Sequence, residues 1–268
     1  REVDAIVHVV RGFDDEDVVR AGSVSPEEDI ETINVELILS DLQVLDKRLE
    51  NLRAETKRSK SLDDERKLVL FENLKATLDS GKLASALSLH PEEAEMTKEL
   101  NLLTLKPMIY VINVNEADLI SPQVSPRARS DLTRNPSLEK NEVKICAKIE
   151  SELSSLDKSD QEMYMKELGI TESGLDKVIK KGYDILGLQT FLTAGPKEVR
   201  AWTVKKGAKA PQAAGVIHTD FERGFIAAEV VSFKDYIQYD GAKGAKEKGL
   251  LRIEGKNYIM QDGDVVEF

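Results

Sequence analysis

Two short polar segments of this chain could contact the base of a nucleotide. Asn113 ends the apolar run PMIYVI, and Glu116 follows three positions later. A second run, EVKIC, leads directly into Ala147 and Lys148. Because open α/β sheets bind ligands beyond the carboxyl ends of their strands, both segments stand where a ligand is expected. Each segment alone is equally consistent with a plain turn or cap at a strand end.

The residue types in the first segment differ from those of a guanine site. In a GTPase the corresponding loop pairs an asparagine with an aspartate three residues on, which accepts hydrogen bonds from donors that guanine has and adenine lacks. Here Val114 replaces the usual lysine, and Glu116 is one methylene longer than aspartate. The sequence CAKIE, with Ala147 and Lys148, resembles the Ser-Ala-Lys loop that covers a purine from the other side. Together the segments predict an altered purine site.

The composition indicates an acidic globular protein. The chain has 268 residues, 41% of them hydrophobic and 32% charged, with a formal net charge of −11. The length suggests one to three domains, and the charge argues against bulk attraction to DNA, RNA or an anionic membrane. Any RNA contact must therefore come from a local basic face. The single cysteine excludes an intrachain disulfide, and no signal peptide or membrane-length apolar run is visible, so we expect a cytoplasmic protein.

A segment with helical periodicity lies between two predicted strands in the first half of the chain. The run AIVHVV at 5–10 predicts a buried strand, and Ser25, Pro26 and Glu28 form a helix start signal. Apolar residues then follow at spacings of four and three, which predicts a coiled-coil seam: Ile38, Leu42, Leu45, Leu49 and Leu52. A second helix is expected at 62–78, after the polar break AETKRSKS, and a third begins at Pro91.

Residues 40–100 therefore look like a helical insertion within one α/β domain. That domain continues through the strand EVKIC and through helices near 159–168 and 174–186. The insertion is either a plain structural hairpin or an arm that docks on a large partner.

From about residue 188 the pattern changes to short strands. The segments LQTFLTA, EVRAWTV, FIAAEVV, LLRIEG and DVVEF alternate with glycine turns, and one helix is expected at 210–219. Several short strands around one helix predict a compact α+β domain of the β-grasp, or ubiquitin-like, kind.

Segments spread over nearly the whole chain resemble the YchF/Obg-like ATPase family. They are REVDAIVHVVRGF, EEDIETINVEL, NVNE, CAKIE, TAGPKEVRAWTV, APQAAGVIHTDFERGFIAAEV and NYIMQDGDVVEF. The most specific part is 191–268, which resembles the TGS domain of that family. The resemblance implies an α/β P-loop NTPase-type G domain of the TRAFAC class at 1–39 and 101–187. A coiled-coil insertion at 40–100 interrupts this partial domain, and a TGS domain follows at 188–268.

The same resemblance implies a function and roles for individual residues. It implies binding of ATP in preference to GTP, slow hydrolysis with Mg²⁺, and association with the ribosome. For such a partner we expect RNA contact through the TGS domain and the helical arm. Asn113 would meet the Hoogsteen edge of adenine, Val114 would contact the base through its backbone, and Glu116 would replace the guanine-reading acid. Ala147 and Lys148 would close the opposite side.

The sequence is also consistent with two other functions. One alternative is a non-catalytic ribosome- or RNA-binding module in which nucleotide only signals conformation. A plain scaffold protein is a third.

Two departures from the family pattern limit the catalytic assignment. The sequence contains no glycine-rich run ending in Gly-Lys-Ser/Thr, and no Asp-x-x-Gly switch segment precedes the apolar run PMIYVI, so the groups that hold phosphates and Mg²⁺ are not in it. In the family these lie upstream of the residue matched by Arg1, and we expect such residues to precede it. Family members commonly carry a histidine in the loop that here reads DDEDVVRAGSV. Arg20 stands near that place, and no catalytic role is carried over to it.

The remaining polar candidates have structural explanations. We expect His8 to be packed in an apolar strand, His90 to cap a helix start, and His218 with Asp220 to be structural or part of a binding surface. Three scattered histidines and one cysteine form no zinc site of usual spacing. Trp202, which has Arg200, Lys205 and Lys206 nearby in the sequence, either packs in the small β domain or stacks on an RNA base.

Overall fold

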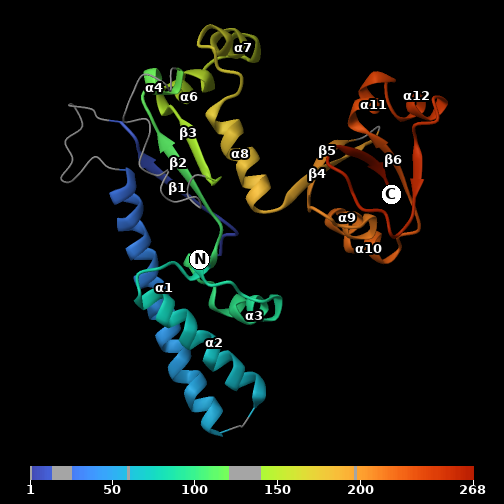
Figure 1. Cartoon of the computed structure of the whole chain (residues 1–268). Coiled ribbons are helices and arrows are strands. Elements are labelled where there is room, and N and C mark those ends of the chain that lie inside the picture. Colours follow the sequence, from blue (N-terminus) through green and yellow to red (C-terminus); the bar gives the residue numbers. More distant parts are fainter. Residues whose placement is uncertain (1, 14–25, 59–60, 121–139, 196–197) are drawn as a thin grey trace. The chain divides into compact units, whose positions relative to one another are not determined.

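Two units follow one another along the chain, Arg1–Gly182 and Tyr183–Phe268. The computed structural model describes residues 2–13, 26–58, 61–120, 140–195 and 198–268 (Figure 1). The acidic loop with Arg20, the start signal at Ser25 and part of the predicted hairpin tip fall outside these residues.

A three-stranded parallel sheet lies at the centre of the first unit. Its strands, in sheet order, are β1 (Ile6–Arg11), β2 (Met108–Asn113) and β3 (Glu142–Ile145). The first five residues of β2 are all buried, as expected for a central parallel strand that is covered on both faces. Asn113 lies opposite the last residue of β1 on one side and the last residue of β3 on the other. The chain therefore leaves all three strands at one edge of the sheet.

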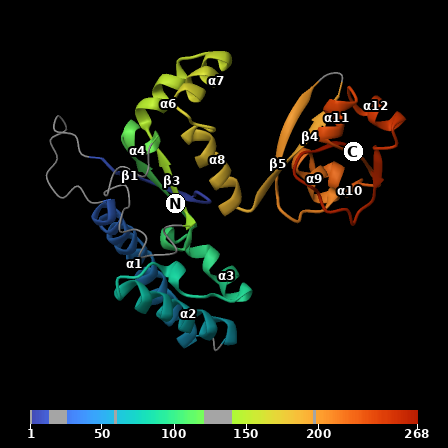
Figure 2. The same cartoon turned by 45° about the horizontal axis from the view of Figure 1, so that its top comes forward.

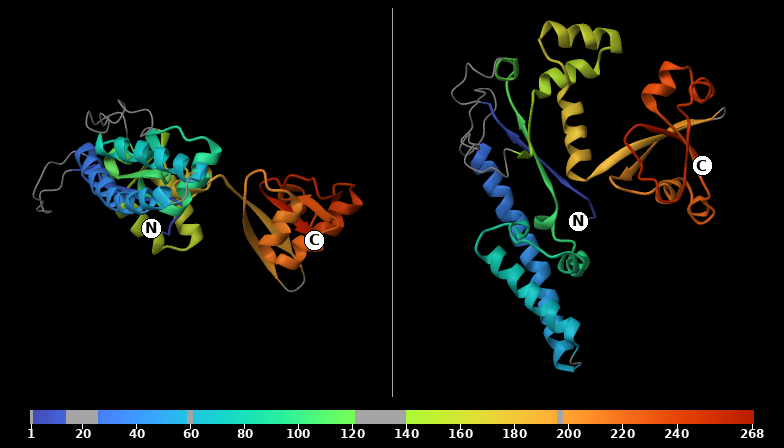
Figure 3. Two further views of the ribbon diagram at one scale, coloured as in Figure 1. Left: turned by 90° about the horizontal axis from the view of Figure 1, so that it is seen from below. Right: turned by 45° about the vertical axis from the view of Figure 1, so that its right-hand side comes forward.

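The predicted seam joins two long helices into an arm. These are α1 (Pro26–Arg58) and α2 (Leu62–Asp79). Leu45, Leu49 and Leu52 of α1 are at most 2% exposed and form one cluster with Phe71 and Leu74 of α2. The helices lie side by side in Figure 1 and in the right-hand view of Figure 3. The coiled-coil prediction is confirmed.

Helix α1 extends further along the predicted polar break than expected. We expected a break over AETKRSKS at 54–61, but α1 continues to Arg58. Alanine, glutamate and lysine have high helix propensity, so the first part of this polar stretch extends the helix. Glu55 also pairs with Arg48 two turns earlier, at 3.2 Å.

A buried carboxylate joins α1 to the chain that returns from the arm. That return contains η1 (Ala84–Ala86), α3 (Pro91–Thr97), η2 (Lys98–Leu100) and η3 (Leu103–Leu105). Asp41 of α1 is 0% exposed. It accepts hydrogen bonds from the Leu103 N–H at 3.0 Å, the Thr104 N–H at 2.7 Å and the Thr104 hydroxyl at 2.8 Å. Asp41 therefore anchors the return segment to α1 just before β2 begins.

Four more helices belong to the described residues of the first unit, and the last of them continues to Ile185, just past the unit boundary. They are α4 (Glu116–Ile120), α6 (Ala147–Ser154), α7 (Lys158–Glu167) and α8 (Gly174–Ile185). The last two confirm the helices predicted near 159–168 and 174–186. Helix α6 occupies sequence that we interpreted only as a loop, and it forms because Ile149 and Leu153 bury one face of it with Cys146. Figures 1 and 2 both show α4 and α6 at the same end of the sheet.

The second unit is a five-stranded mixed sheet with short helices. Its strands, in sheet order, are β5 (Val199–Lys205), β4 (Leu188–Ala194), β8 (Asp264–Glu267), β6 (Ala228–Ser232) and β7 (Arg252–Glu254). Strands β4 and β8 are parallel, and the other pairs are antiparallel. Its helices are α9 (Ala210–Ile217), α10 (Thr219–Arg223), α11 (Phe233–Gln238) and α12 (Ala242–Glu247).

The core of this unit lies between the sheet and α9. Ala213 and Ala214 of α9 are 0% exposed and pack with Phe191 of β4 and Val230 of β6. The predicted strands and the predicted helix are present, whereas the short helices α10, α11 and α12 were not predicted.

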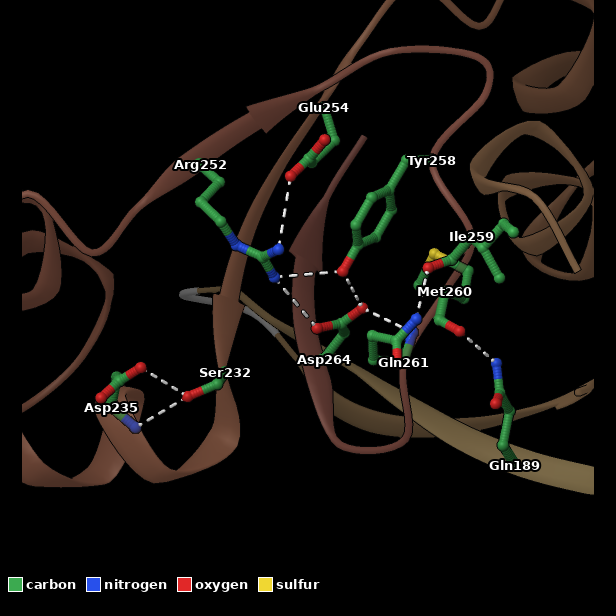
Figure 4. A network of polar contacts seen from close by, with 10 residues as sticks. All are labelled: Gln189, Ser232, Asp235, Arg252, Glu254, Tyr258, Ile259, Met260, Gln261 and Asp264. Carbon is green, nitrogen blue, oxygen red and sulfur yellow. Dashed lines mark hydrogen bonds and ion pairs between the residues drawn. The ribbon is translucent and has the colours of Figure 1, made fainter. Parts of the chain in front are cut away.

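A polar network closes the loop between β7 and β8 (Figure 4). Asp264, 2% exposed, accepts hydrogen bonds from the Tyr258 hydroxyl at 2.8 Å and the Gln261 N–H at 2.9 Å. The Arg252 guanidinium reaches the Tyr258 hydroxyl at 3.1 Å and Glu254 at 3.3 Å. A buried carboxylate is costly without hydrogen-bond partners, and here two of these partners lie in the loop. The hydrogen bonds to Asp264 therefore hold the loop in place.

Nowhere in the described chain does a helix have both the length and the apolar character that crossing a membrane requires.

Candidate nucleotide site

The two predicted polar segments are joined directly at the carboxyl edge of the parallel sheet. The Asn113 side-chain oxygen Oδ1 accepts a hydrogen bond from the Ala147 N–H at 2.9 Å. The Val114 N–H donates to the Ile145 carbonyl at 2.8 Å, and the Gly12 N–H donates to the Asn113 carbonyl at 2.8 Å. The segments after β2 and β3 are therefore held against each other.

This contact defines what Asn113 can offer to a ligand. Because the Ala147 N–H is the hydrogen-bond donor, the amide oxygen must face it, and both N–H groups of the amide nitrogen Nδ2 point elsewhere. Within the described residues, Nδ2 has no hydrogen-bond partner. Asn113 is thus a hydrogen-bond donor whose orientation is fixed by the neighbouring loop.

Val114 can contact a ligand only through its backbone. Its side chain is 5% exposed and packs with Val10 and Ile112 in the core under the sheet. Its N–H is already bonded to Ile145, so the carbonyl oxygen is the atom that remains.

Glu116 and Lys148 form a weak ion pair on the surface of the site. Glu116 begins α4, and its carboxylate lies 3.6 Å from the Lys148 ammonium. The two side chains are 40% and 70% exposed. Exposed ion pairs contribute about 0–1 kcal/mol, so a ligand can displace this pair at little cost.

Ala147 begins α6 and is positioned by the residues around it. The preceding residue, Cys146, is 3% exposed, and Ile149 and Leu153 anchor the helix in the same cluster. Since the Ala147 N–H is bonded to Asn113, this residue presents an exposed surface rather than a free donor.

Glu150, which no sequence pattern singles out, fixes α6 against α8. Its carboxylate accepts hydrogen bonds from the Gly174 N–H at 2.7 Å and the Leu175 N–H at 3.1 Å. A negative charge is favourable at a helix N-terminus. A β-carbon on Gly174 would lie 2.7 Å from the Ile145 side chain, so only glycine fits at this junction. The sequence signals a helix start near 174, but no local pattern identifies an acid so far away as its cap.

A tyrosine on α7 is bonded to the same helix. The Tyr164 hydroxyl donates to the Glu152 carboxylate of α6. This hydrogen bond, with a smaller contribution from burial, raises the pKa of Tyr164 to about 12. Tyr164 therefore stays protonated at neutral pH, and its hydrogen bond joins α7 to α6.

The histidines have the structural roles that we expected. His8 is 7% exposed, and burial lowers its pKa from the ordinary value. At His90, the backbone N–H donates to the Glu93 carboxylate at 2.8 Å at the start of α3. The His218 ring nitrogen Nδ1 accepts from the Asp220 N–H at 3.2 Å and caps α10.

Trp202 is packed in the second unit. It lies partly buried against the core, and its indole N–H donates to the Thr193 hydroxyl at 2.9 Å. The Arg200 guanidinium lies 4.1 Å from the indole ring centre. Lys205 donates to the Leu186 carbonyl, at 2.9 Å. An RNA base could stack on Trp202 only by displacing Arg200.

Comparisons with known proteins cover both units. The family model YchF-GTPase_C, described as a protein of unknown function (DUF933), matches residues 188–268. The "Ribosome-binding ATPase YchF" of Bacillus subtilis is 45% identical over 269 residues, which are 100% of this chain and 73% of that protein. The Haemophilus influenzae protein of the same name is 46% identical over 271 residues, with the same coverage.

A solved structure has the same fold. The Schizosaccharomyces pombe YchF GTPase matches with a TM-score of 0.84 and 32% sequence identity, covering 99% of this chain and 72% of that chain. The α/β fold class with a G domain and a TGS-like domain, predicted from the sequence, is confirmed by this match.

Proposed function

Since the chain belongs to the YchF family, we propose that it is an ATP-binding and slowly ATP-hydrolysing regulatory protein that associates with the ribosome. Its relatives carry the name ribosome-binding ATPase. The observation that supports the nucleotide part is the hydrogen bond between Asn113 and Ala147, because it joins the two loops that the base-binding hypothesis requires to be neighbours.

The hydrogen-bonding groups that remain at the site suit adenine better than guanine. On its Hoogsteen edge, adenine presents the acceptor N7 and a donor amine at C6, whereas guanine presents two acceptors, N7 and O6. We assign the Asn113 Nδ2 donor to N7 and the Val114 carbonyl acceptor to the C6 amine. Guanine would place its O6 against that carbonyl, oxygen against oxygen.

Glu116 and Lys148 have a different role from the acid and lysine of a guanine site. In our proposal Glu116 only guides Lys148 toward the site through this weak ion pair, and the aliphatic stem of Lys148 covers one face of the bound base. Ala147 covers the base beside it. This assignment uses the 3.6 Å ion pair as its starting geometry.

The residues named above contact only the base of the nucleotide, and none of them is assigned to its phosphates. The printed sequence has no Gly-Lys-Ser/Thr loop. Among the described residues no group of three or more acidic, histidine or cysteine side chains could hold a metal ion. We therefore assign no residue to Mg²⁺, which would enter together with the phosphates of ATP.

Base recognition can be tested on this chain with nucleosides. Adenosine and guanosine are titrated into ¹⁵N-labelled protein, and the Asn113 side-chain and Ala147 backbone resonances are followed by NMR. Adenosine is expected to shift both signals. The variant Asn113→Asp keeps an acceptor for Ala147 but replaces the amide donors with a charged oxygen, so adenosine binding should weaken about tenfold.

Asn115→Asp is the matched control, since Asn115 is exposed two positions away and the charge change is identical. It should leave adenosine binding within about twofold of wild type. Equal weakening in the two variants, or equal affinity for the two nucleosides, would remove the base-reading assignment.

The distribution of charge supports the second unit as the part that meets ribosomal RNA. Residues 183–268 contain twelve Lys and Arg and twelve Asp and Glu, so residues 1–182 carry the entire net charge of −11. A neutral unit approaches phosphates without bulk repulsion. Co-sedimentation with ribosomes should decrease as salt rises. Absence of co-sedimentation at low salt, with or without ATP, would contradict ribosome association.

A further inference from the structure

A groove of about 800 Å³ lies on the arm, between α2 and α3 and away from the nucleotide site. Leu70, 5% exposed, and the partly buried Met96 line its inner part. Leu62 and Val69 line it as well, yet they are 74% and 59% exposed. The arm thus carries an open apolar groove.

The two exposed side chains belong to a second apolar stripe on α2. Leu62 and Val69 are seven positions apart, so they lie on one face of the helix, two turns from each other. The seam that packs on α1 uses other positions, among them Phe71 and Leu74. Helix α2 therefore has one apolar stripe covered by α1 and another that is open to a further helix. Apolar side chains gathered at a groove mark an interaction surface.

Acidic side chains surround this groove. Glu65, Glu92 and Glu93 line it with one base, Arg66. Glu65 and Glu92 form no ion pair within the described part of the chain. Residues 61–99 hold nine acidic and five basic side chains. Three of those bases are paired with acids of the arm or of the return segment, as Lys67–Glu99, Lys75–Asp46 and Lys98–Glu95. Among the described residues that line it, the groove is therefore apolar inside and mainly acidic at its edge.

We infer that this groove binds a cationic amphipathic helix of a partner protein. Apolar side chains of the incoming helix, spaced about seven residues apart, would pack on Leu62 and Val69 as a third helix of the bundle. Lysine or arginine residues beside them would face Glu65 and Glu92. RNA does not fit this surface, because its phosphates would meet the same carboxylates. The arm is accordingly a protein-binding element, and this inference does not depend on the nucleotide site.

The test uses the whole chain and a defined probe. A fluorescein-labelled helical peptide of about three heptads, with leucines seven residues apart and lysines beside them, is titrated by fluorescence anisotropy at low salt. A scrambled peptide of the same composition and a labelled RNA oligonucleotide are the comparison ligands. Binding of the ordered peptide, and not of the other two, is expected.

Paired variants localise the binding. Val69→Asp should weaken it about tenfold, and Leu39→Asp, at a 55% exposed position of α1 outside the groove, should not. Glu65→Lys should weaken it about threefold, and Glu36→Lys, at an exposed position of α1, by much less. All four sites are exposed, and circular dichroism checks that each variant is folded.

Three results would overturn the inference. They are no binding of the ordered peptide at low salt, equal binding of the scrambled peptide, and equal effects of the groove variants and their controls. Tighter binding of the RNA, lost in Val69→Asp, would assign the groove to nucleic acid instead.

Discussion

Replacing Asp41 should destabilise the first unit more than any exposed substitution on the same helix. Its carboxylate accepts three hydrogen bonds, two of them from Thr104, which is 0% exposed. A hydrogen bond to a charged group contributes about 1.5–3 kcal/mol, and buried donors left without an acceptor add a desolvation cost. The sum is reduced because the buried charge itself is also removed. We expect Asp41→Ala to lower the free energy of unfolding by about 3–5 kcal/mol.

Asp41→Asn should cause about half the loss of unfolding free energy that Asp41→Ala causes. Asparagine keeps one acceptor oxygen but turns an N–H group toward a donor, so we expect a loss of about 1.5–3 kcal/mol. The assay is urea unfolding followed by far-UV circular dichroism, together with amide hydrogen exchange at Leu103 and Thr104. Both amides should lose protection in Asp41→Ala, because they are the donors to the missing carboxylate.

Asp46→Ala is the control on the same helix. Asp46 pairs with Lys75 at 2.8 Å, but its side chain is 55% exposed. Removing such a pair should cost no more than about 1 kcal/mol. If Asp41→Ala and Asp46→Ala unfold at the same urea concentration, the argument from buried acceptors is wrong.

Three further predictions concern other parts of the fold. Glu152→Gln should move the pKa of Tyr164 down from about 12 toward its ordinary value, since the hydrogen bond to the carboxylate is the largest cause of the shift, and ultraviolet difference absorbance measures it. Burial lowers the pKa of His8, so folding favours the neutral imidazole. The stability linked to this neutral form is complete above the ordinary pKa of 6.5 and is lost as the pH falls toward the pKa of the folded state. His8→Phe should remove this part of the pH dependence of urea unfolding. Gly244→Ala should destabilise the second unit by at least about 2 kcal/mol, because a β-carbon would lie 1.8 Å from a backbone carbonyl oxygen, while Gly255→Ala, with open space around it, should be nearly neutral in thermal unfolding.

Periodicity predicted most of the architecture because it reflects which face of each element is buried. The spacing of Leu45, Leu49 and Leu52 predicts the arm, and those residues are buried where the spacing requires. The apolar run ending at Asn113 predicts a central strand, and it is covered on both faces. The strands of the second unit follow from β-branched residues between glycine turns.

Contacts between distant residues could not be predicted in the same way. In the sequence, Asp41 looks like any other polar residue of the helix. Its contact with Thr104 is visible only in the folded structure. Glu150 likewise caps a helix that begins 24 residues later. For the candidate site, order along the chain placed Asn113 and Ala147 near each other. Which atoms of each remain for a ligand depends on the hydrogen bond between them.

The position of Trp202 has a practical consequence for spectroscopy. It is the only tryptophan in the chain, and it lies in the second unit with its indole N–H bonded and a guanidinium against its ring. Selective excitation of tryptophan therefore reports melting of the second unit alone, whereas circular dichroism is dominated by the long helices of the arm. Comparing the fluorescence and circular dichroism signals during one denaturation would reveal whether the two units unfold in a single transition or one after the other.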